Sequence, residues 1–150
     1  MIAGEIKVLI FKIDEEYYAT DIMEVERILG HEDTTKLPDS PSFIEGVINY
    51  EGDILPIVNL CTKFNIKFNG AKKESKVIVV KSQNNKIGML VDSVSEVRDV
   101  SLDDIKMPPN IVSGISNRYI RGLIKHEDEI IIFLDLNSIL TEEEKEFLKV

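Results

Sequence analysis

The sequence contains few of the residues that catalysis, disulfide bonding or metal binding most often require. Its 150 residues include no tryptophan, one cysteine (Cys61) and two histidines (His31 and His126). A single cysteine excludes an intramolecular disulfide and a zinc site built on several thiolates. We therefore expect no metal and no cofactor, and a reducing compartment is the simplest one for a single free thiol.

An excess of basic residues is also lacking. The chain carries 18 Lys and Arg against 27 Asp and Glu, a net charge of −9. Nucleic-acid binders depend on clustered Lys and Arg, so this balance argues against a nucleic-acid partner. No signal peptide is visible, and the longest apolar run, Ile130–Leu134, is far shorter than the ~20 residues that span a bilayer. We expect no direct membrane insertion.

What is present is a composition typical of a globular protein and an internal repeat. Apolar residues make up 43% of the chain. Residues 43–60 align with residues 119–136 at an offset of 76, and six of the 18 aligned positions are identical. Residues 5–12 align with residues 74–81 at an offset of 69, and four of these eight positions are identical. The offsets differ by seven, so the second copy has additional residues after Val97.

The additional residues fall in a stretch that contains Pro108, Pro109 and Gly114, which is typical of an inserted loop. We therefore expect one domain of two related halves. The first subdomain covers about residues 5–69 and the second about residues 74–140. Chance similarity between β-rich segments is the alternative explanation.

The periodicity within each half predicts short strands. Lys7–Ile13 and Lys76–Lys81 are rich in β-branched residues and suit strands buried on one or both faces. Asp21–Leu29 also fits one face of a helix, but the repeat favours strand, turn and strand. The expected hairpins join Lys7–Ile13 to Tyr17–Ile22, Lys76–Lys81 to Lys86–Val91, Val47–Asn49 to Ile54–Asn59, and Leu123–Lys125 to Glu129–Asp135. Five short strands in each half would close a small barrel, so the predicted fold is all-β with two tandem barrels packed together.

Only the C-terminal segment has a convincing helical pattern. Thr141-Glu-Glu-Glu144 is a capping box, with acidic residues at the positive end of the helix dipole. We expect a short helix over about residues 141–149, which Phe147 and Leu148 attach to the rest of the protein.

No catalytic constellation is apparent. Cys61 follows an apolar strand with no histidine near it in the sequence, which is typical of a buried hydrophobe rather than a nucleophile. An OB-fold that binds single strands is an alternative small barrel, but it requires basic grooves and stacking aromatics. These observations favour a non-enzymatic protein-binding module. A β-barrel enzyme or small-ligand binder remains the alternative of another class, and a pocket of converging polar groups would distinguish it.

Several segments together resemble the CheW family of chemotaxis coupling proteins. The matching segments are Phe43–Asn49, Gly52–Leu60, Gly88–Val97, Asp104–Pro109, Tyr119–Gly122 and Ile130–Leu140. The resemblance covers roughly Glu5 to Leu140, and the combined segments are specific. It implies two five-stranded SH3-like barrels with a hydrophobic groove between them. It also implies a cytoplasmic adaptor that links the helical hairpin of a chemoreceptor's cytoplasmic tip to the regulatory domain of the histidine kinase CheA in membrane-bound receptor arrays. A CheW-like module from another kinase or adaptor pathway is the alternative within the same fold.

The resemblance also implies which residues face the receptor, whereas it assigns none to the kinase contact. The receptor-facing residues are Val25, Arg27, Gly46, Glu51, Val94 and Val97. The family usually carries Glu where Arg27 stands and Arg where Glu51 stands. Because both charges are reversed together, we expect Arg27 and Glu51 to lie close together at the mouth of the groove. Core packing is the alternative role for the three valines, and a turn requirement is the alternative for Gly46.

Overall fold

The computed structural model describes residues 4–67, 74–82, 85–107 and 118–148. The expected loop residues Pro108, Pro109 and Gly114, and residues 83–84 of an expected hairpin, lie outside the described residues. Within these ranges the protein is built mainly from β-strands, so the all-β prediction is confirmed. The strands are β1 (Glu5–Ile13), β2 (Glu16–Asp21), β3 (Val25–Leu29), β4 (Ile44–Tyr50), β5 (Asp53–Asn59), β6 (Lys76–Ser82), β7 (Asn85–Val91), β8 (Ser93–Ser101), β9 (Ile105–Lys106), β10 (Ile120–His126) and β11 (Glu129–Leu134). The helices are α1 (Leu60–Lys63) and α2 (Glu142–Phe147), with 3₁₀ turns η1 (Ile22–Glu24), η2 (Leu102–Asp104) and η3 (Leu136–Ser138).

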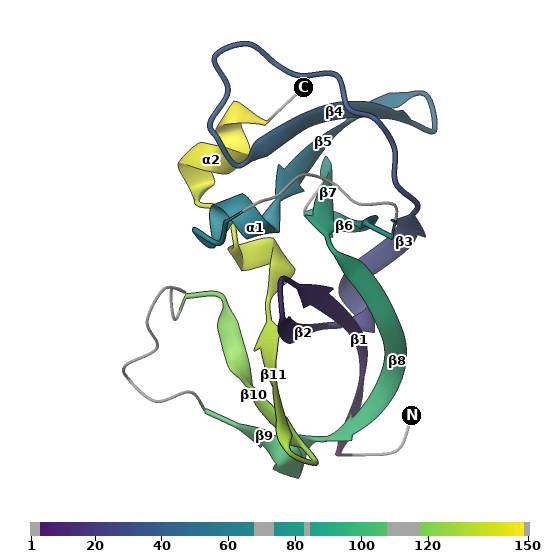
Figure 1. Ribbon diagram of the computed structural model, residues 1–150, viewed down its shortest axis with the longest axis vertical. Helices are drawn as coiled ribbons and strands as arrows, with labels where there is room; N and C mark the ends of the chain where they lie inside the picture. The colour runs from purple at the N-terminus through teal and green to yellow at the C-terminus, as the bar shows by residue number, and fades with distance from the viewer. Residues whose placement is uncertain (1–3, 68–73, 83–84, 108–117, 149–150) are drawn as a thin grey trace.

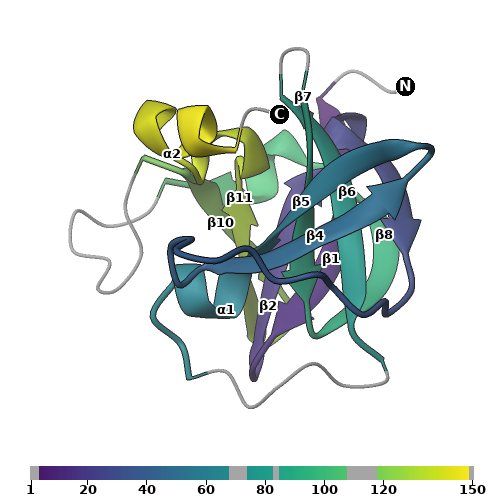
Figure 2. The ribbon, with the colours of Figure 1, turned by 90° about the horizontal axis from the view of Figure 1, so that it is seen from above.

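The strands form two sheets that lie one above the other in Figure 1. Sheet A, the lower one, has the order β8-β1-β2-β11-β10-β9 over the described residues. Sheet B has the order β3-β6-β7-β5-β4. Helix α2 and strand β8 lie on opposite sides of the molecule, as Figures 1 and 2 both show.

The two sheets exchange hairpins between the halves of the sequence repeat. The β1–β2 hairpin belongs to the first half but pairs with β8 and β11 of the second half. The β6–β7 hairpin belongs to the second half but pairs with β3 and β5 of the first. The sheets therefore do not follow the expected subdomain boundaries, residues 5–69 and 74–140. A repeat shows which segments are related. It does not show which copy of a hairpin joins which sheet, because either copy can pair with the same neighbouring strands.

The strand pairing nevertheless supports the repeat residue by residue. The offsets of 69 and 76 convert the order β3-β6-β7-β5-β4 into β8-β1-β2-β11-β10, so the same order of five strands recurs in sheet A, where β9 is a sixth strand. This order is consistent with the expected five-stranded barrels. The parallel pair Ile57–Gly88 in sheet B corresponds to Phe133–Ala19 in sheet A. The β-bulges also recur, at Ile44/Gly46 and at Ile120/Gly122.

The buried apolar residues of the described ranges form three clusters, of which one joins the two sheets. One lies within sheet A around Val8 and Ile10, and one lies within sheet B around Val77 and Val79. The third, which we call the shared core, contains residues of both sheets, among them Leu9, Phe11, Ile78 and Val80. Successive residues of a strand point to opposite faces. Strands β1 and β6 are therefore buried on both faces, as their continuous apolar runs predict.

Helix α2 begins as predicted. Thr141 forms the capping box with Glu144, whose backbone N–H donates to Thr141 Oγ1 over 3.1 Å. Lys63 of α1 adds an ion pair to Glu144 at 2.7 Å. Leu148 is buried in the shared core, whereas Phe147 is 49% exposed. Leu148 thus attaches the helix to the shared core. The expectation that Phe147 also attaches it is wrong, because Phe147 lies on the solvent-facing side of this short helix.

Candidate functional site

Arg27 and Glu51 form an ion pair, as predicted from their reversed charges. Arg27 Nη1 lies 3.1 Å from Glu51 Oε1, and both side chains are about half exposed. Arg27 stands on the edge strand β3, and Glu51 stands in the turn between β4 and β5. Glu51 adopts φ 52° and Gly52 φ 85°, the positive values that tight hairpins require. The hairpin turn therefore brings Glu51 to β3 across 24 positions of sequence.

A buried tyrosine and a carboxylate lie next to this ion pair. The guanidinium of Arg27 lies 5.7 Å from the centre of the Tyr50 ring. The Tyr50 hydroxyl donates a 2.7 Å hydrogen bond to Glu26. Glu26 also contacts the ammonium groups of Lys81 at 3.4 Å and Lys86 at 3.1 Å. Side chains from three other strands, β4, β6 and β7, thus contact Glu26 of β3.

The ionisation of these groups follows from their contacts. The Tyr50 hydrogen bond and Lys86 lower the pKa of Glu26 to about 2. Burial, followed by the hydrogen bond to Glu26, raises the pKa of Tyr50 to about 12. Glu26 is therefore a carboxylate and Tyr50 a hydrogen-bond donor throughout the neutral range.

Sequence reasoning missed Glu26 and Tyr50 although both adjoin predicted residues. In a regular strand, adjacent side chains such as those of Glu26 and Arg27 point to opposite faces. The register of β3 on β6 shifts between Val25 and Arg27, so Glu26 is the extra residue of a β-bulge. A bulge has no signature in the local apolar pattern, which is why the cluster emerges only from the structure.

Gly46 is explained by a close backbone approach. Its φ is 146°, and a Cβ there would lie 2.5 Å from the carbonyl oxygen of Thr35. The segment around Thr35 crosses β4 and forms a bridge with Val47. The structure therefore accounts for Gly46 on steric grounds, in a bulged strand and not in the turn that was its alternative explanation.

The three valines differ in exposure. Val25 and Val94 are half-buried and both pack against the shared core, so the structure brings these equivalent residues to one cluster. Val97 is 49% exposed. Its repeat equivalent is Ile28, which is 39% exposed and was not among the predicted residues.

Val97 and Ile28 both face the side of their sheets on which the shared core lies. Val97 is paired with Leu9, and Ile28 is paired with Ile78. Directly opposed residues on antiparallel strands point to the same face. Leu9 and Ile78 are both members of the shared core. The exposed edges of β3 and β8 therefore present aliphatic side chains beside the junction of the two sheets.

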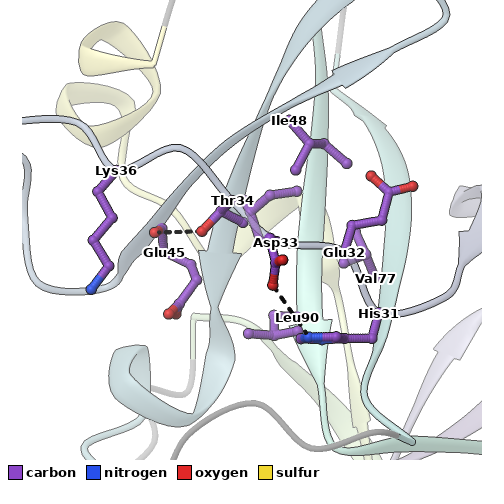
Figure 3. A pocket seen from close by; sticks show the side chains of 10 residues that line it. His31, Glu32, Asp33, Thr34, Lys36, Glu45, Ile48, Val77 and Leu90 are labelled. Carbon is purple, nitrogen blue, oxygen red and sulfur yellow. Dashed lines mark hydrogen bonds and ion pairs between the residues drawn. The ribbon is translucent and has the colours of Figure 1, made fainter.

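A cavity of about 350 Å³ lies between residues 31–36 and the face of sheet B that carries the cluster around Val77 and Val79 (Figure 3). Its apolar lining is Ile48, Ile57, Val77 and Leu90, and its polar lining is His31, Glu32, Asp33, Thr34, Lys36 and Glu45. His31 Nε2 lies 3.9 Å from Asp33, whose side chain is fully exposed. Glu45 accepts a 3.2 Å hydrogen bond from the Asn59 side-chain amide. In Figure 3 the Glu32 side chain points away from Glu45. The polar groups of this cavity thus do not converge on one point.

Cys61 lies in the shared core, and its thiol is 3.6 Å from the carbonyl oxygen of Lys67. Burial raises the pKa of the thiol to about 11, so the reactive thiolate is scarce at neutral pH. The described residues contain no group of His, Cys, Asp and Glu suited to hold a metal ion. Nor does the described part of the chain contain a helix long and apolar enough to cross a membrane.

Comparison with known proteins identifies the family of this fold. The CheW-like domain model matches residues 7–144, so the chain belongs to the CheW-like family. The chemotaxis protein CheW of Thermotoga maritima is 36% identical over 92% of this chain and 89% of its own length. The Treponema pallidum CheW is 28% identical over 93% of this chain and 85% of its own length.

A solved structure agrees with this assignment. The crystal structure titled scaffolding protein TtCheW from Thermoanaerobacter tengcongensis superposes with a TM-score of 0.87 and 34% identity. The superposition covers 95% of this chain and 97% of that chain. The resemblance noted from the sequence is therefore confirmed for the family and for its fold.

Proposed function

We propose that this protein is a chemotaxis adaptor that couples chemoreceptor cytoplasmic tips to the regulatory domain of the histidine kinase CheA. The observation that carries the proposal is the near-complete superposition on a scaffolding protein of the same family. The protein acts on the cytoplasmic side of receptor arrays and catalyses no reaction. The high pKa of the Cys61 thiol and the dispersed polar groups of the sheet B cavity support a binding role.

The receptor contacts the surface formed by Val25, Arg27, Gly46, Glu51, Val94 and Val97. Val97, Arg27 and Glu51 are exposed and contact the helical hairpin of the receptor directly. Val25 and Val94 hold the adjoining strands on the shared core, and Gly46 lets the segment around Thr35 cross β4. Apolar side chains framed by an ion pair suit a helix that lies in a groove.

The exchanged ion pair contributes to specificity more than to folding. An exposed pair of this kind stabilises a fold by only ~0.2–1 kcal/mol. A receptor helix that covers Arg27 and Glu51 excludes water from them, and either charge left alone would then be buried unpaired. A receptor surface with matching charges is therefore preferred over one that fits the family's usual signs.

The kinase domain binds at a different surface, so that one adaptor joins two partners. Contacts between unlike surfaces of neighbouring barrels can close into rings or extend into arrays.

A three-component titration tests this function. The full-length protein is mixed with a receptor cytoplasmic fragment and a CheA regulatory domain, and complexes are followed by sedimentation. We expect each partner to bind alone and a ternary complex to form when both are present. Competition of the two partners for one surface would contradict the proposal, as would the failure of either partner to bind.

A further inference from the structure

Two carboxyl groups meet at the edge of sheet A where the chain leaves it twice. Strands β2 and β11 are parallel neighbours, with Thr20 opposite Leu134, so their C-terminal ends lie at the same edge. After β2 the chain passes through η1 into β3 of sheet B. After β11 it passes through η3 toward α2. Glu24 ends η1, and Asp135 immediately precedes η3.

The hydrogen bonds at this edge join the two crossings. Glu24 accepts from the Thr20 hydroxyl at 2.8 Å and from the Asn137 side-chain amide at 3.2 Å. Asp135 accepts from the Asn137 backbone N–H at 3.1 Å and from the Ser138 hydroxyl at 2.8 Å. Thr20 is fully buried. Each carboxyl group is therefore fixed in position by donors of the surrounding chain.

Asn137 bridges the two carboxyl groups, because its side-chain amide donates to Glu24 and its backbone N–H donates to Asp135. Two ionised carboxylates on one bridge repel each other, and a proton kept by one of them can be donated to the other. Arg121 of β10 acts to lower the pKa of both groups, and it also pairs with Asp21 at the end of β2 at 3.8 Å. The positive charge of Arg121 is therefore shared among three carboxyl groups.

At the equivalent end of sheet B, the two positions that correspond to Glu24 and Asp135 do not hold carboxyl groups. The repeat offsets convert Glu24 into Ser93, Asp135 into Asn59 and Arg121 into Glu45. There the Asn59 amide donates to Glu45, a contact that needs no shared proton. The carboxyl pair is therefore a property of one edge and not a requirement of the fold.

We propose that Glu24 and Asp135 form a proton-controlled clasp, which holds η1 against the end of sheet A while the two groups share a proton and loosens when both ionise. The clasp sits directly before Val25 and Arg27. Burial and the hydrogen bond to Asp135 raise the pKa of Glu24 to about 7, so the change falls near neutrality. Burial opposes ionisation of Asp135, but hydrogen bonds from Glu24, Ser138 and Asn137 together lower its pKa.

The sign of the effect follows from where the proton resides. Between the ordinary pKa of 4.5 and about 7, the folded protein holds the Glu24 proton and the unfolded chain does not. Stability therefore falls as pH rises through this window and is constant above it. The consequence for receptor binding rests on the proposed function: affinity should weaken as the start of β3 loosens.

Thermal and urea unfolding of the full chain between about pH 5 and about pH 8 tests the clasp. We expect the folding equilibrium constant of the unchanged protein to fall by up to about tenfold per pH unit below pH 7. Glu24→Gln keeps a donor toward Asp135 without a titrating proton, so it should remove this slope. Asp135→Asn supplies the donor from the other side and should remove it as well. Glu16→Gln, the same change at an exposed position of β2, should leave the slope intact.

Backbone NMR of the same proteins gives a second measurement. Amides of residues 20–27 and 135–138 should shift together with a midpoint near pH 7 in the unchanged protein and remain fixed in Glu24→Gln. A slope that persists in both clasp variants, or amides that show no titration near neutrality, would overturn the clasp. If the titration is present but no receptor fragment binds at any pH, the clasp stands and the proposed function fails.

Discussion

The two sheets share one backbone plan but carry different charges at equivalent positions. Arg27 and Glu51 of sheet B form an ion pair, whereas their repeat equivalents are Glu96 and Glu127. Glu127 adopts φ 53°, almost the same as Glu51 at 52°. Glu96 pairs instead with Arg98 of its own strand. The two turns therefore have the same backbone conformation, whereas the charges of the side chains beside them differ.

The exchanged hairpins explain why both sheets must fold together. Each sheet lacks two adjacent interior strands until the other half of the chain supplies them. The shared core is then completed by residues of β1 and β6, which are buried on both faces. A cut between the two halves of the repeat would remove interior strands from both sheets, which is why neither half is expected to fold alone.

The largest expected difference between the two halves concerns the bulge glycines. In Gly46→Ala the new Cβ would lie 2.5 Å from the Thr35 carbonyl oxygen, in a residue with positive φ. We expect the free energy of unfolding to fall by about 2–4 kcal/mol. In Gly122→Ala the closest atom, at 2.6 Å, is a side-chain methyl of Ile105, and its movement should limit the loss to about 1–2 kcal/mol. Urea unfolding measures both. Equal losses of stability in the two variants would show that the backbone around Thr35 moves as easily as the Ile105 side chain.

The ion pair is expected to affect binding rather than folding. Arg27→Glu places two carboxylates together and Glu51→Arg two cations, so each should weaken receptor binding about tenfold, ~1.4 kcal/mol. The double exchange should restore part of the affinity, and melting temperatures should change little because the pair is exposed. Calorimetric titration with a receptor fragment measures the cycle. Losses that simply add in the double variant would contradict coupling between the two residues.

The contact between Glu26 and Tyr50, next to the ion pair, should make the stability of sheet B depend on pH in the acidic range. The low pKa of Glu26, about 2, contributes stability above its ordinary value of 4.5, and this stability is lost as pH falls through 2. Tyr50→Phe removes the main hydrogen bond, so it should destabilise the protein more at pH 7 than at about pH 2. Tyr17→Phe, at the half-buried tyrosine of β2, is the matched control and should show no such difference. Unfolding curves at the two pH values decide between these outcomes.

The smallest expected effect comes from copying the sheet B charge into sheet A. Glu96→Arg places a cation at the position equivalent to Arg27, opposite the turn that carries Glu127. The exposed pair should add less than about 1 kcal/mol, and the loss of the Arg98 partner offsets part of it. Urea unfolding at low and high salt would reveal the pair as a salt-dependent gain. A clear loss at both salt concentrations would show that the two corners differ in geometry as well as in charge.

Local patterns in the sequence determined most strands of this protein and its C-terminal helix. Alternating and continuous apolar runs specify strands, Gly52 marks the turn between β4 and β5, and the Thr141 capping box specifies the start of α2. The repeat specified that the same set of elements occurs twice. The resemblance to the CheW family, whose usual charges are exchanged at both positions, also indicated that Arg27 and Glu51 lie together, because a joint change of sign favours a contact between them.

Only the tertiary structure decided how these elements combine. Hydrogen bonding between strands has no sequence code, so the pairing of β1 with β8 rather than with β3 depended on packing of the whole chain. The bulge that turns Glu26 toward Tyr50 and the edge that joins Glu24 to Asp135 also arise from contacts between distant segments. Such contacts depend on register and on the direction of neighbouring strands, which are set by burial of both faces of β1 and β6 and not by any local run of residues.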